Sequence, residues 1–211
     1  MKRCLKRLGF TFRRARRVTA KVPCPKKQGR VRRALSRLHR LEGAGKCQVL
    51  YGDESGFCLS PLVPYLWQPK GKALGLPAKA HSRRWNALGF LSRAGSLHHF
   101  ETQERITASF VIESIEALLP VVSGPTVVVL DNASVHRSKL VKAKRKEWKQ
   151  KGLRLLFLPP YCPPLNLIET LWRQVKYRWL WPEAYQNFET LCQSVTDILA
   201  QVGTKYQLSF A

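Results

Sequence analysis

Apolar and polar residues follow one another along this chain in patterns that predict one mixed α/β domain. Strand-like patterns occur at residues 48–53, 57–63, 85–91, 97–102, 127–130 and 153–158. Helical spacing of apolar residues occurs at residues 31–41, 106–119, 138–149, 167–180 and 188–202. The early strands predict an antiparallel meander, in which 48–53 pairs with 57–63 through a turn at 54–56. The later part predicts right-handed βαβ crossovers, so we expect a mixed sheet with helices on both faces.

Positive charge is concentrated at the beginning of the sequence. The 211 residues include 37 Lys+Arg against 13 Asp+Glu, a net charge of +24, and two thirds of this excess lies in the first 50 residues. The hydrophobic fraction of 45% suffices for a folded core and excludes a wholly disordered chain. We therefore predict a basic arm or linker at residues 1–45, a globular domain at residues 46–211 and a polyanionic partner.

The sequence shows no pattern of a secreted or membrane protein. Its longest apolar runs fall far short of the roughly 20 residues that cross a bilayer. No apolar segment follows the basic start, as one would in a signal peptide. The six cysteines lack zinc-finger spacing. These features predict a cytoplasmic protein with reduced thiols and no membrane partner.

Three acidic residues stand at the ends of predicted elements. Asp53 closes the first strand, Asp131 follows the apolar run at 127–130, and Glu169 lies in the first turn of a helix. Sites in open α/β sheets form at the carboxyl ends of strands, and carboxylates with water are the ligands that Mg²⁺ prefers. Each acid also has a simpler interpretation, as a turn residue or as a charge that complements a helix dipole. Glu54 is a rival ligand beside Asp53.

Longer motifs surround these acids. Residues 131–138 read DNASVHRS, residues 158–172 read LPPYCPPLNLIETLW, and YGDE at 51–54 is followed by WQPKG at 67–71. These segments resemble the DDE transposases of the bacterial insertion-sequence and mariner superfamily. The resemblance implies a ribonuclease H-like, mixed five-stranded sheet with helices on both faces. It also implies that Asp53, Asp131 and Glu169 are catalytic and bind two Mg²⁺ ions, for which Mn²⁺ can substitute.

The same resemblance implies a reaction and its partners. In this family, metal ions activate water to nick DNA at the end of the element, and the freed 3′ hydroxyl attacks target DNA. The expected partners are transposon-end and target DNA, with a second copy of this chain as a candidate in a homodimer. Two alternatives stay open, namely a catalytically silent DNA-binding remnant and a ribonuclease H or resolvase-type nuclease. The proline-asparagine string before Glu169 argues against the second alternative.

Two departures from the family pattern are visible. The 37 residues between Asp131 and Glu169 form a slightly longer gap than is common in the family. The helix-turn-helix module that reads terminal repeats is missing upstream, and residues 5–10 look like its last piece. We therefore expect an amino-terminally truncated transposase, in which the arm at residues 1–45 is the remnant of the helix-turn-helix region.

Basic and aromatic residues near these motifs are candidates for contact with DNA. They are Trp67, Lys70, Lys72, His136, Arg137, Lys139, Lys142, Lys144 and Arg145. The simpler interpretation of the basic run is a solvated helix face, and that of His136 is a structural role. We further expect Asn166 to cap the helix that carries Glu169. Trp172, Trp179 and Trp181 are expected in the core.

Overall fold

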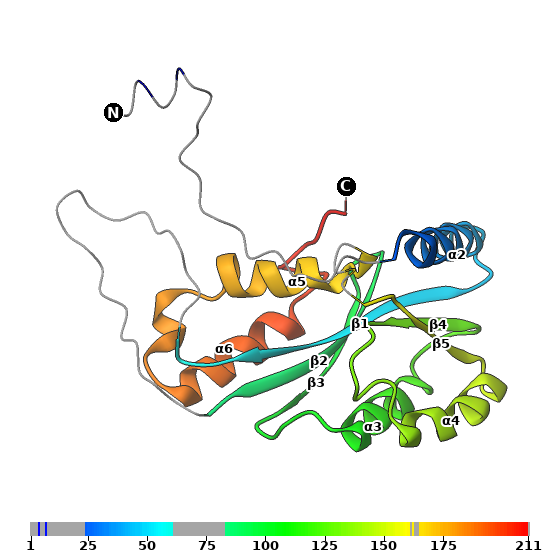
Figure 1. Cartoon of the computed structure of the whole chain (residues 1–211). Helices are drawn as coiled ribbons and strands as arrows, with labels where there is room; N and C mark the ends of the chain where they lie inside the picture. Colours follow the sequence, from blue (N-terminus) through cyan, green and yellow to red (C-terminus); the bar gives the residue numbers. More distant parts are fainter. Residues whose placement is uncertain are drawn as a thin grey trace.

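A five-stranded sheet forms the centre of the molecule (Figure 1). The computed structural model describes Cys4, Arg7, residues 24–60 and 83–160, Cys162 and residues 165–210. The strands are β1 (Gln48–Phe57), β2 (Trp85–Ser92), β3 (Leu97–Thr102), β4 (Thr126–Leu130) and β5 (Leu153–Phe157), in the order β3-β2-β1-β4-β5. β2 pairs antiparallel with β1 and β3, whereas β4 pairs parallel with β1 and β5. The predicted mixed sheet is confirmed.

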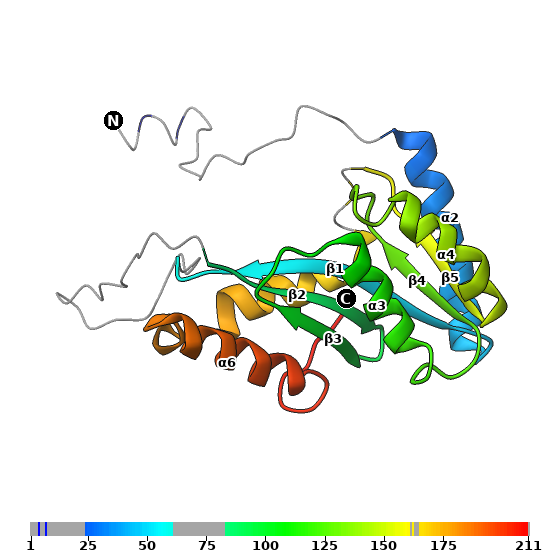
Figure 2. The same cartoon turned by 90° about the horizontal axis from the view of Figure 1, so that it is seen from below.

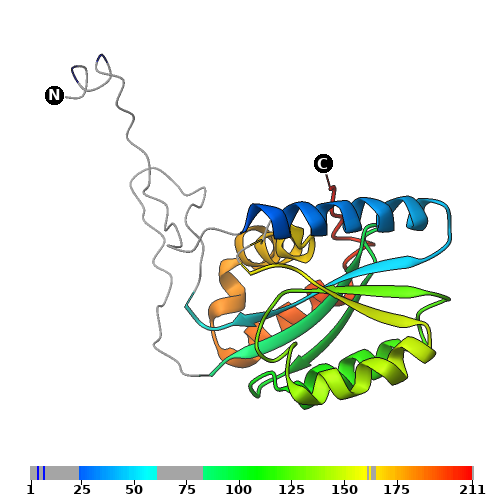
Figure 3. The ribbon, with the colours of Figure 1, turned by 45° about the vertical axis from the view of Figure 1, so that its right-hand side comes forward.

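Helices cover both faces of this sheet (Figure 3). One face carries α3 (Ala108–Leu118) and α4 (Lys139–Gln150), which bury Ile115 and Trp148 against β1 and β4. The opposite face carries α2 (Pro25–Gly43), α5 (Ile168–Gln174) and α6 (Phe188–Ala200). α6 runs beside the edge strand β3 (Figure 2). Two apolar cores therefore lie on opposite sides of the sheet, with the apolar run of β4 buried between them, whereas the edge strand β5 is mostly half-buried.

The hairpin that the sequence predicted at residues 48–63 is wrong. β1 continues through residues 54–56, and its partner there is β2, with Phe57 opposite Trp85. The Phe57 side chain is buried, and its ring packs edge-on against that of Trp172 with the centroids 6.3 Å apart. This apolar anchor extends the strand beyond its polar stretch. Asp53 consequently lies inside β1 rather than at its end.

Helix α2 arises from the predicted basic arm and contacts the sheet. Its Leu35 is buried in the core, and its Glu42 accepts a hydrogen bond of 3.0 Å from the backbone N–H of Val49. His39 Nε2 lies 2.6 Å from the hydroxyl oxygen of Tyr51. Residues 25–43 are thus tied to β1 by apolar and polar contacts, while the domain boundary at residue 46 stays a prediction.

The chain after α5 changes its helical geometry. The π-helical turn η2 (Val175–Trp179) and the 3₁₀ turn η3 (Pro182–Tyr185) connect α5 to α6. Trp172 and Trp179 pack in the core as predicted, but Trp181 is 68% exposed, so its expected burial was wrong. In the described ranges, no helix combines the length and the apolar character needed to cross a membrane.

Candidate functional site

Asp53 lies on the face of the sheet that α5 covers. Side chains alternate along a strand, so Asp53 shares a face with Tyr51, which belongs to the α5 core. Its neighbour across the β1–β2 ladder is Gly89. A Cβ at Gly89 would lie only 3.0 Å from Cδ1 of Ile168 and 3.1 Å from the ring of Trp172. The missing side chain therefore lets α5 approach the sheet directly beside Asp53.

Glu169 reaches the same region because it lies in the first turn of α5. The start of this helix is held to β1 by Asn166, whose Nδ2 donates a buried hydrogen bond of 3.1 Å to the backbone oxygen of Gly52. Asn166 does not cap the helix, because the residue at the N-cap position is Leu167 and no side chain caps it. The predicted cap is therefore wrong, and the amide instead links the third-acid motif to the residue before Asp53.

Asp131 follows β4 directly, at the carboxyl end that the sequence indicated. The last residue of β4, Leu130, pairs with Gly52 of β1, so Asp131 is brought beside Asp53. One carboxylate oxygen, Oδ1, accepts hydrogen bonds from the Ala133 N–H at 2.9 Å and from the His136 ring at 2.7 Å. These two donors fix the side chain at the start of the loop.

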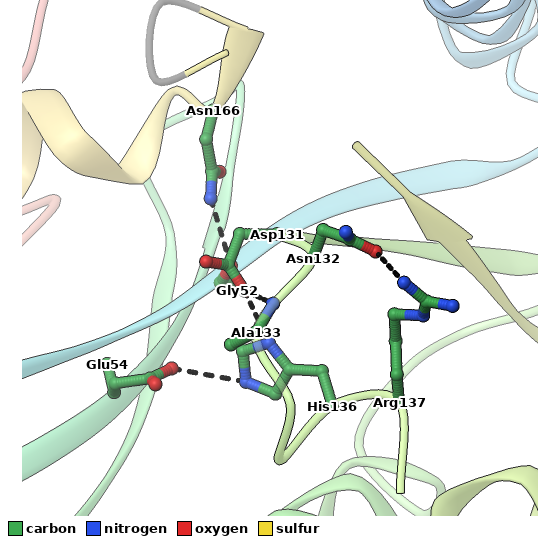
Figure 4. A network of polar contacts seen from close by, with 8 residues as sticks. All are labelled: Gly52, Glu54, Asp131, Asn132, Ala133, His136, Arg137 and Asn166. Atoms are coloured by element: carbon green, nitrogen blue, oxygen red, sulfur yellow. Dashed lines mark hydrogen bonds and ion pairs between the residues drawn. The ribbon is translucent and has the colours of Figure 1, made fainter. Parts of the chain in front are cut away.

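His136 joins Asp131 to Glu54 (Figure 4). Its ring is completely buried, with Nδ1 on Asp131 and Nε2 3.1 Å from Oε2 of Glu54. This burial corrects the expectation that His136 contacts DNA, since its ring faces the protein's own carboxylates. Because Glu54 follows Asp53 in the strand, its side chain points to the other face. Glu54 is thus an ion-pair partner of His136 on the face opposite to Asp53.

The carboxylates of Asp53, Asp131 and Glu169 lie close enough to change one another's pKa. Burial, followed by repulsion from Glu54, Glu169 and Asp131, raises the pKa of Asp53 to about 8. Burial also raises the pKa of Glu169, which Asp131 raises further and Lys176 and Arg173 oppose. A cluster of carboxylates that disfavours its own ionisation is an environment that a bound cation would relieve.

At Asp131 and His136, hydrogen bonds outweigh the effect of burial on the pKa. Burial raises the pKa of Asp131, but the hydrogen bonds from His136 and Ala133 outweigh it, and the net shift is downward. Burial lowers the pKa of His136, yet its contacts with Asp131 and Glu54 raise it to about 9. His136 is therefore a cation at neutral pH, and both ring nitrogens can donate.

Lys176 belongs to this site, although sequence reasoning missed it. It lies seven residues after Glu169, two helical turns further along the same side. Burial lowers its pKa, while Asp53 and Glu169 raise it, so both carboxylates lie close enough to act on its ammonium. Its Nζ stands 5.3 Å from the centre of the Phe57 ring. The spacing of seven on a predicted helix was the signal that could have identified it.

The donor set fits a divalent cation, although no metal cage is ready-made. Within the described ranges, no three His, Cys, Asp or Glu side chains are gathered closely enough to hold an ion. Three mutually repelling carboxylates nevertheless share the region, and only one of the two oxygens of Asp131 is hydrogen-bonded within the described part of the chain. The Oδ1 atom of Asn166 is also buried without a hydrogen-bond partner there. Such oxygen donors match the preference of Mg²⁺.

The residues predicted to contact DNA fall into three groups: some lie outside the described residues, some are exposed, and one is paired with acidic side chains. Trp67, Lys70 and Lys72 lie outside the described residues. Arg137 is exposed and donates to Oδ1 of Asn132 at 3.0 Å. Lys139, Lys142 and Arg145 are exposed on α4. Lys144 is paired within the protein instead, because its ammonium lies 2.9 Å from Glu116 of α3 and 3.2 Å from Glu147 of α4.

Comparison with known proteins identifies the family. Residues 48–192 match the DDE superfamily endonuclease family. A 39 kDa protein of insertion element IS630 from Shigella sonnei is 24% identical over 178 residues, which are 82% of this chain and 50% of that protein. The chain thus spans half the length of this curated relative.

Solved structures confirm the fold. The Mos1 mariner paired-end complex with Mn superposes with a TM-score of 0.64 at 14% identity, over 94% of this chain and 62% of that one. The catalytic domain of Mos1 mariner transposase gives a TM-score of 0.52 at 14% identity, covering 85% of each chain. The expected ribonuclease H-like transposase catalytic fold is thereby confirmed. Since the family match spans more than half of the chain, this protein belongs to the DDE superfamily endonuclease family.

Proposed function

We propose that this chain is the catalytic domain of a transposase, which cleaves DNA phosphodiester bonds and transfers strands with Mg²⁺ or Mn²⁺. The observation that carries the proposal is the convergence of Asp53, Asp131 and Glu169 from β1, β4 and α5, with the pKa of Asp53 raised to about 8 by burial and by its acidic neighbours. The names of the relatives support it, since they include an insertion-element protein and a mariner complex with Mn.

The three carboxylates would hold the metal ions, and the surrounding residues have distinct tasks. Two divalent cations would supply activation of a water or 3′ hydroxyl and stabilisation of the leaving oxygen. His136 holds one oxygen of Asp131, which leaves the other oxygen available as a ligand. Lys176 places a positive charge next to Asp53 and Glu169, where it would attract a DNA phosphate.

DNA is the proposed partner, and the exposed positive charge indicates how it is bound. Lys139, Lys142 and Arg145 on α4 and Arg137 before it can contact phosphates, which attract the protein irrespective of sequence. The homodimer remains our proposal for how two ends would be brought together.

A nicking assay on supercoiled plasmid tests the proposal. We expect wild-type protein to nick in Mn²⁺ and to be silent in EDTA, and we expect Glu169→Gln to lose nicking while it retains DNA binding. Arg178→Gln, on an exposed part of η2, is the control for a change in charge. Equal nicking in EDTA and Mn²⁺ would exclude the two-metal reaction.

A DNA-binding remnant without catalysis is the second candidate. It is favoured by the observation that, in the described ranges, no three metal-ligating side chains are gathered closely enough to hold an ion. Wild-type protein that binds DNA with strong salt dependence, yet neither nicks plasmid nor is stabilised by Mn²⁺, would favour this candidate.

A further inference from the structure

A basic cleft of about 580 Å³ lies beside the carboxylates and has no role in the function proposed above. Its walls come from the far end of β1, the start of β2, the segment before α3 and the loop after Asp131. The residues that matter for its chemistry are Glu54, Gly56, Arg84, Asn86, Arg105 and Ser134. One wall thus includes Glu54, the residue after Asp53.

The cleft carries positive charge that the protein does not neutralise. Arg83 lies 3.5 Å from Glu189 and stacks 4.2 Å above the ring of Phe188, so it has a partner. Arg84 and Arg105 are exposed and form no ion pair within the described ranges. The remaining segments, residues 1–23 and 61–82, contain neither Asp nor Glu. An anion is therefore the ligand that this cleft would attract.

The floor of the cleft is bare backbone at Gly56. A Cβ at this position would lie 3.0 Å from Oδ1 of Asn86 and 3.8 Å from Cδ of Arg84. The Asn86 amide is itself fixed, because its Nδ2 donates to the backbone oxygen of Glu104 at 2.8 Å. A side chain at Gly56 would therefore crowd the fixed Asn86 amide in the wall of the cleft, and the glycine avoids this contact.

A second hollow continues the cleft toward the catalytic candidates. It measures about 340 Å³ and shares Gly56 and Arg84 with the first. Its wall includes Lys176, whose ammonium is within electrostatic reach of Asp53 and Glu169. Arg84 consequently stands between two hollows, in a track that leads from Arg105 past the end of β1 to Lys176, the neighbour of the carboxylates.

The dimensions of this track distinguish a single strand from a duplex. Both hollows lie within the range of small-ligand sites, about 300–1,000 Å³, which suits a nucleotide or two but not a section of double helix. The cleft also offers Ile106 and Val135 as apolar contacts. No aromatic side chain lines the described part of the first hollow, and the two that line the second, Phe57 and Tyr185, are each only 4% exposed. We therefore expect phosphate contacts to dominate binding.

On the basis of the proposed function, we propose that this track binds the unpaired DNA strand that adjoins the cleaved phosphate, with Arg84 and Arg105 on its backbone. The track makes the site select frayed or already nicked ends over intact duplex. It does not read sequence, since its cations address phosphates rather than base edges.

Fluorescence anisotropy in EDTA with two probes tests this proposal. One probe is a blunt duplex, and the other is the same duplex with a short unpaired tail, tested in 3′ and in 5′ versions. We expect wild-type protein to bind a tailed probe about tenfold more tightly at low salt. The double variant Arg84→Ala/Arg105→Ala should bind both probes equally. On the tailed probe its plot of log affinity against log salt should be shallower by about 1.4, or ~0.7 for each lost single-strand contact.

The control variant is Arg154→Ala, which removes an exposed arginine from the edge strand β5. It should retain the preference for the tail. Three results would overturn the proposal: no preference in wild type, a preference that survives in the double variant, or equal losses on blunt and tailed probes. Plasmid nicking in Mn²⁺ is measured separately. Tail binding without nicking would reject the proposed catalysis alone, and nicking without tail preference would reject the track alone.

Discussion

The imidazole of His136 is completely buried, and its Nδ1 lies 2.7 Å from Oδ1 of Asp131. Its other nitrogen lies 3.1 Å from Glu54, so the ring links the loop after β4 to β1. The second oxygen of Asp131 points away from the ring (Figure 4). His136 is therefore placed to position Asp131 without entering the reaction itself.

Removal of this ring should destabilise the fold and change its response to pH. We expect His136→Gln to lower the free energy of unfolding by about 1–3 kcal/mol at pH 6. This is less than for a fully buried pair, because both carboxylates are partly exposed to solvent. The pKa of His136 is raised from 6.5 to about 9, so its contribution is complete below about 6.5 and is lost as the pH rises through about 9.

Urea denaturation between pH 6 and pH 10 measures this effect. The difference in unfolding free energy between wild type and His136→Gln should shrink across that window. His98→Gln, which changes a partly exposed histidine of β3, serves as control and should show no such convergence. A constant difference from pH 6 to pH 10 would mean that His136 is not held as a cation.

Metal binding should depend on the ionisation of Asp53. Its pKa is raised to about 8, so the folded state keeps a proton that the unfolded chain loses above 3.8. Stability is therefore lost as the pH rises from about 3.8 through about 8, and Mn²⁺ should restore it most where Asp53 is ionised. We expect the Mn²⁺-induced rise in Tm to be larger at pH 8.5 than at pH 6.

The matched variant Asp53→Asn separates charge from shape. In EDTA at pH 8.5 it should be more stable than wild type, by at least about 1 kcal/mol, because the repelling charge is gone. It should also lose most of the Mn²⁺ effect. Thermal melts with Mn²⁺ and with EDTA at both pH values measure these changes, and the same Mn²⁺ shift in wild type and Asp53→Asn would contradict the assignment.

Features of the fold that depend on local interactions could be predicted from the sequence, whereas those that depend on contacts between distant residues could not. The strands β4 and β5 were predictable, because their runs of apolar residues encode an extended segment locally. The course of β1 was not. The residues at 54–56 have good turn chemistry, yet the packing of Phe57 on Trp172 keeps the strand extended. Tertiary contact outweighed local preference there.

For the candidate site, too, the sequence indicated the residues but not the contacts that hold them together. Motif resemblance indicated Asp53, Asp131 and Glu169, but it gave no information on what holds them together. The bond from Asn166 to Gly52 spans 114 residues, and only the fold reveals that Gly89 lies opposite Asp53. Lys176 could have been found from its helical spacing to Glu169. The pairing of Glu54 with His136 could not, since it joins two elements that are distant in sequence.

Gly89 should be essential for the approach of α5 to the sheet. In Gly89→Ala the new Cβ would lie 3.0–3.1 Å from the side chains of Ile168 and Trp172, which must give way by a few tenths of an ångström. We expect α5 to move with these two side chains, because both are packed in the core. We expect a loss of about 1–3 kcal/mol in stability, as for other overpacked cores, and a weaker Mn²⁺-induced rise in Tm because Glu169 moves with the helix.

Gly43→Ala is the control for this substitution. Gly43 is the last residue of α2, and a Cβ there would meet nothing within 4 Å. Its replacement should therefore be neutral or stabilise by up to about 1 kcal/mol. Chemical denaturation and Mn²⁺ titration followed by thermal melting apply to both variants. An unchanged Mn²⁺ response in Gly89→Ala would show that α5 need not touch the sheet at this point.

Lys176 should have opposite effects on metal binding and on DNA cleavage. Its half-buried ammonium repels a cation at Asp53 and Glu169, but it would attract the phosphate that is to be cleaved. We expect Lys176→Met to bind Mn²⁺ several-fold more tightly and to nick plasmid about tenfold or more slowly. Methionine keeps much of the chain length beside the Phe57 ring and removes the charge.

The control is Arg178→Met, at an exposed position of η2, which should alter neither Mn²⁺ affinity nor the rate of nicking. If Lys176→Met weakened Mn²⁺ binding and nicking together, the lysine would be a structural support of the site rather than a contact for the substrate.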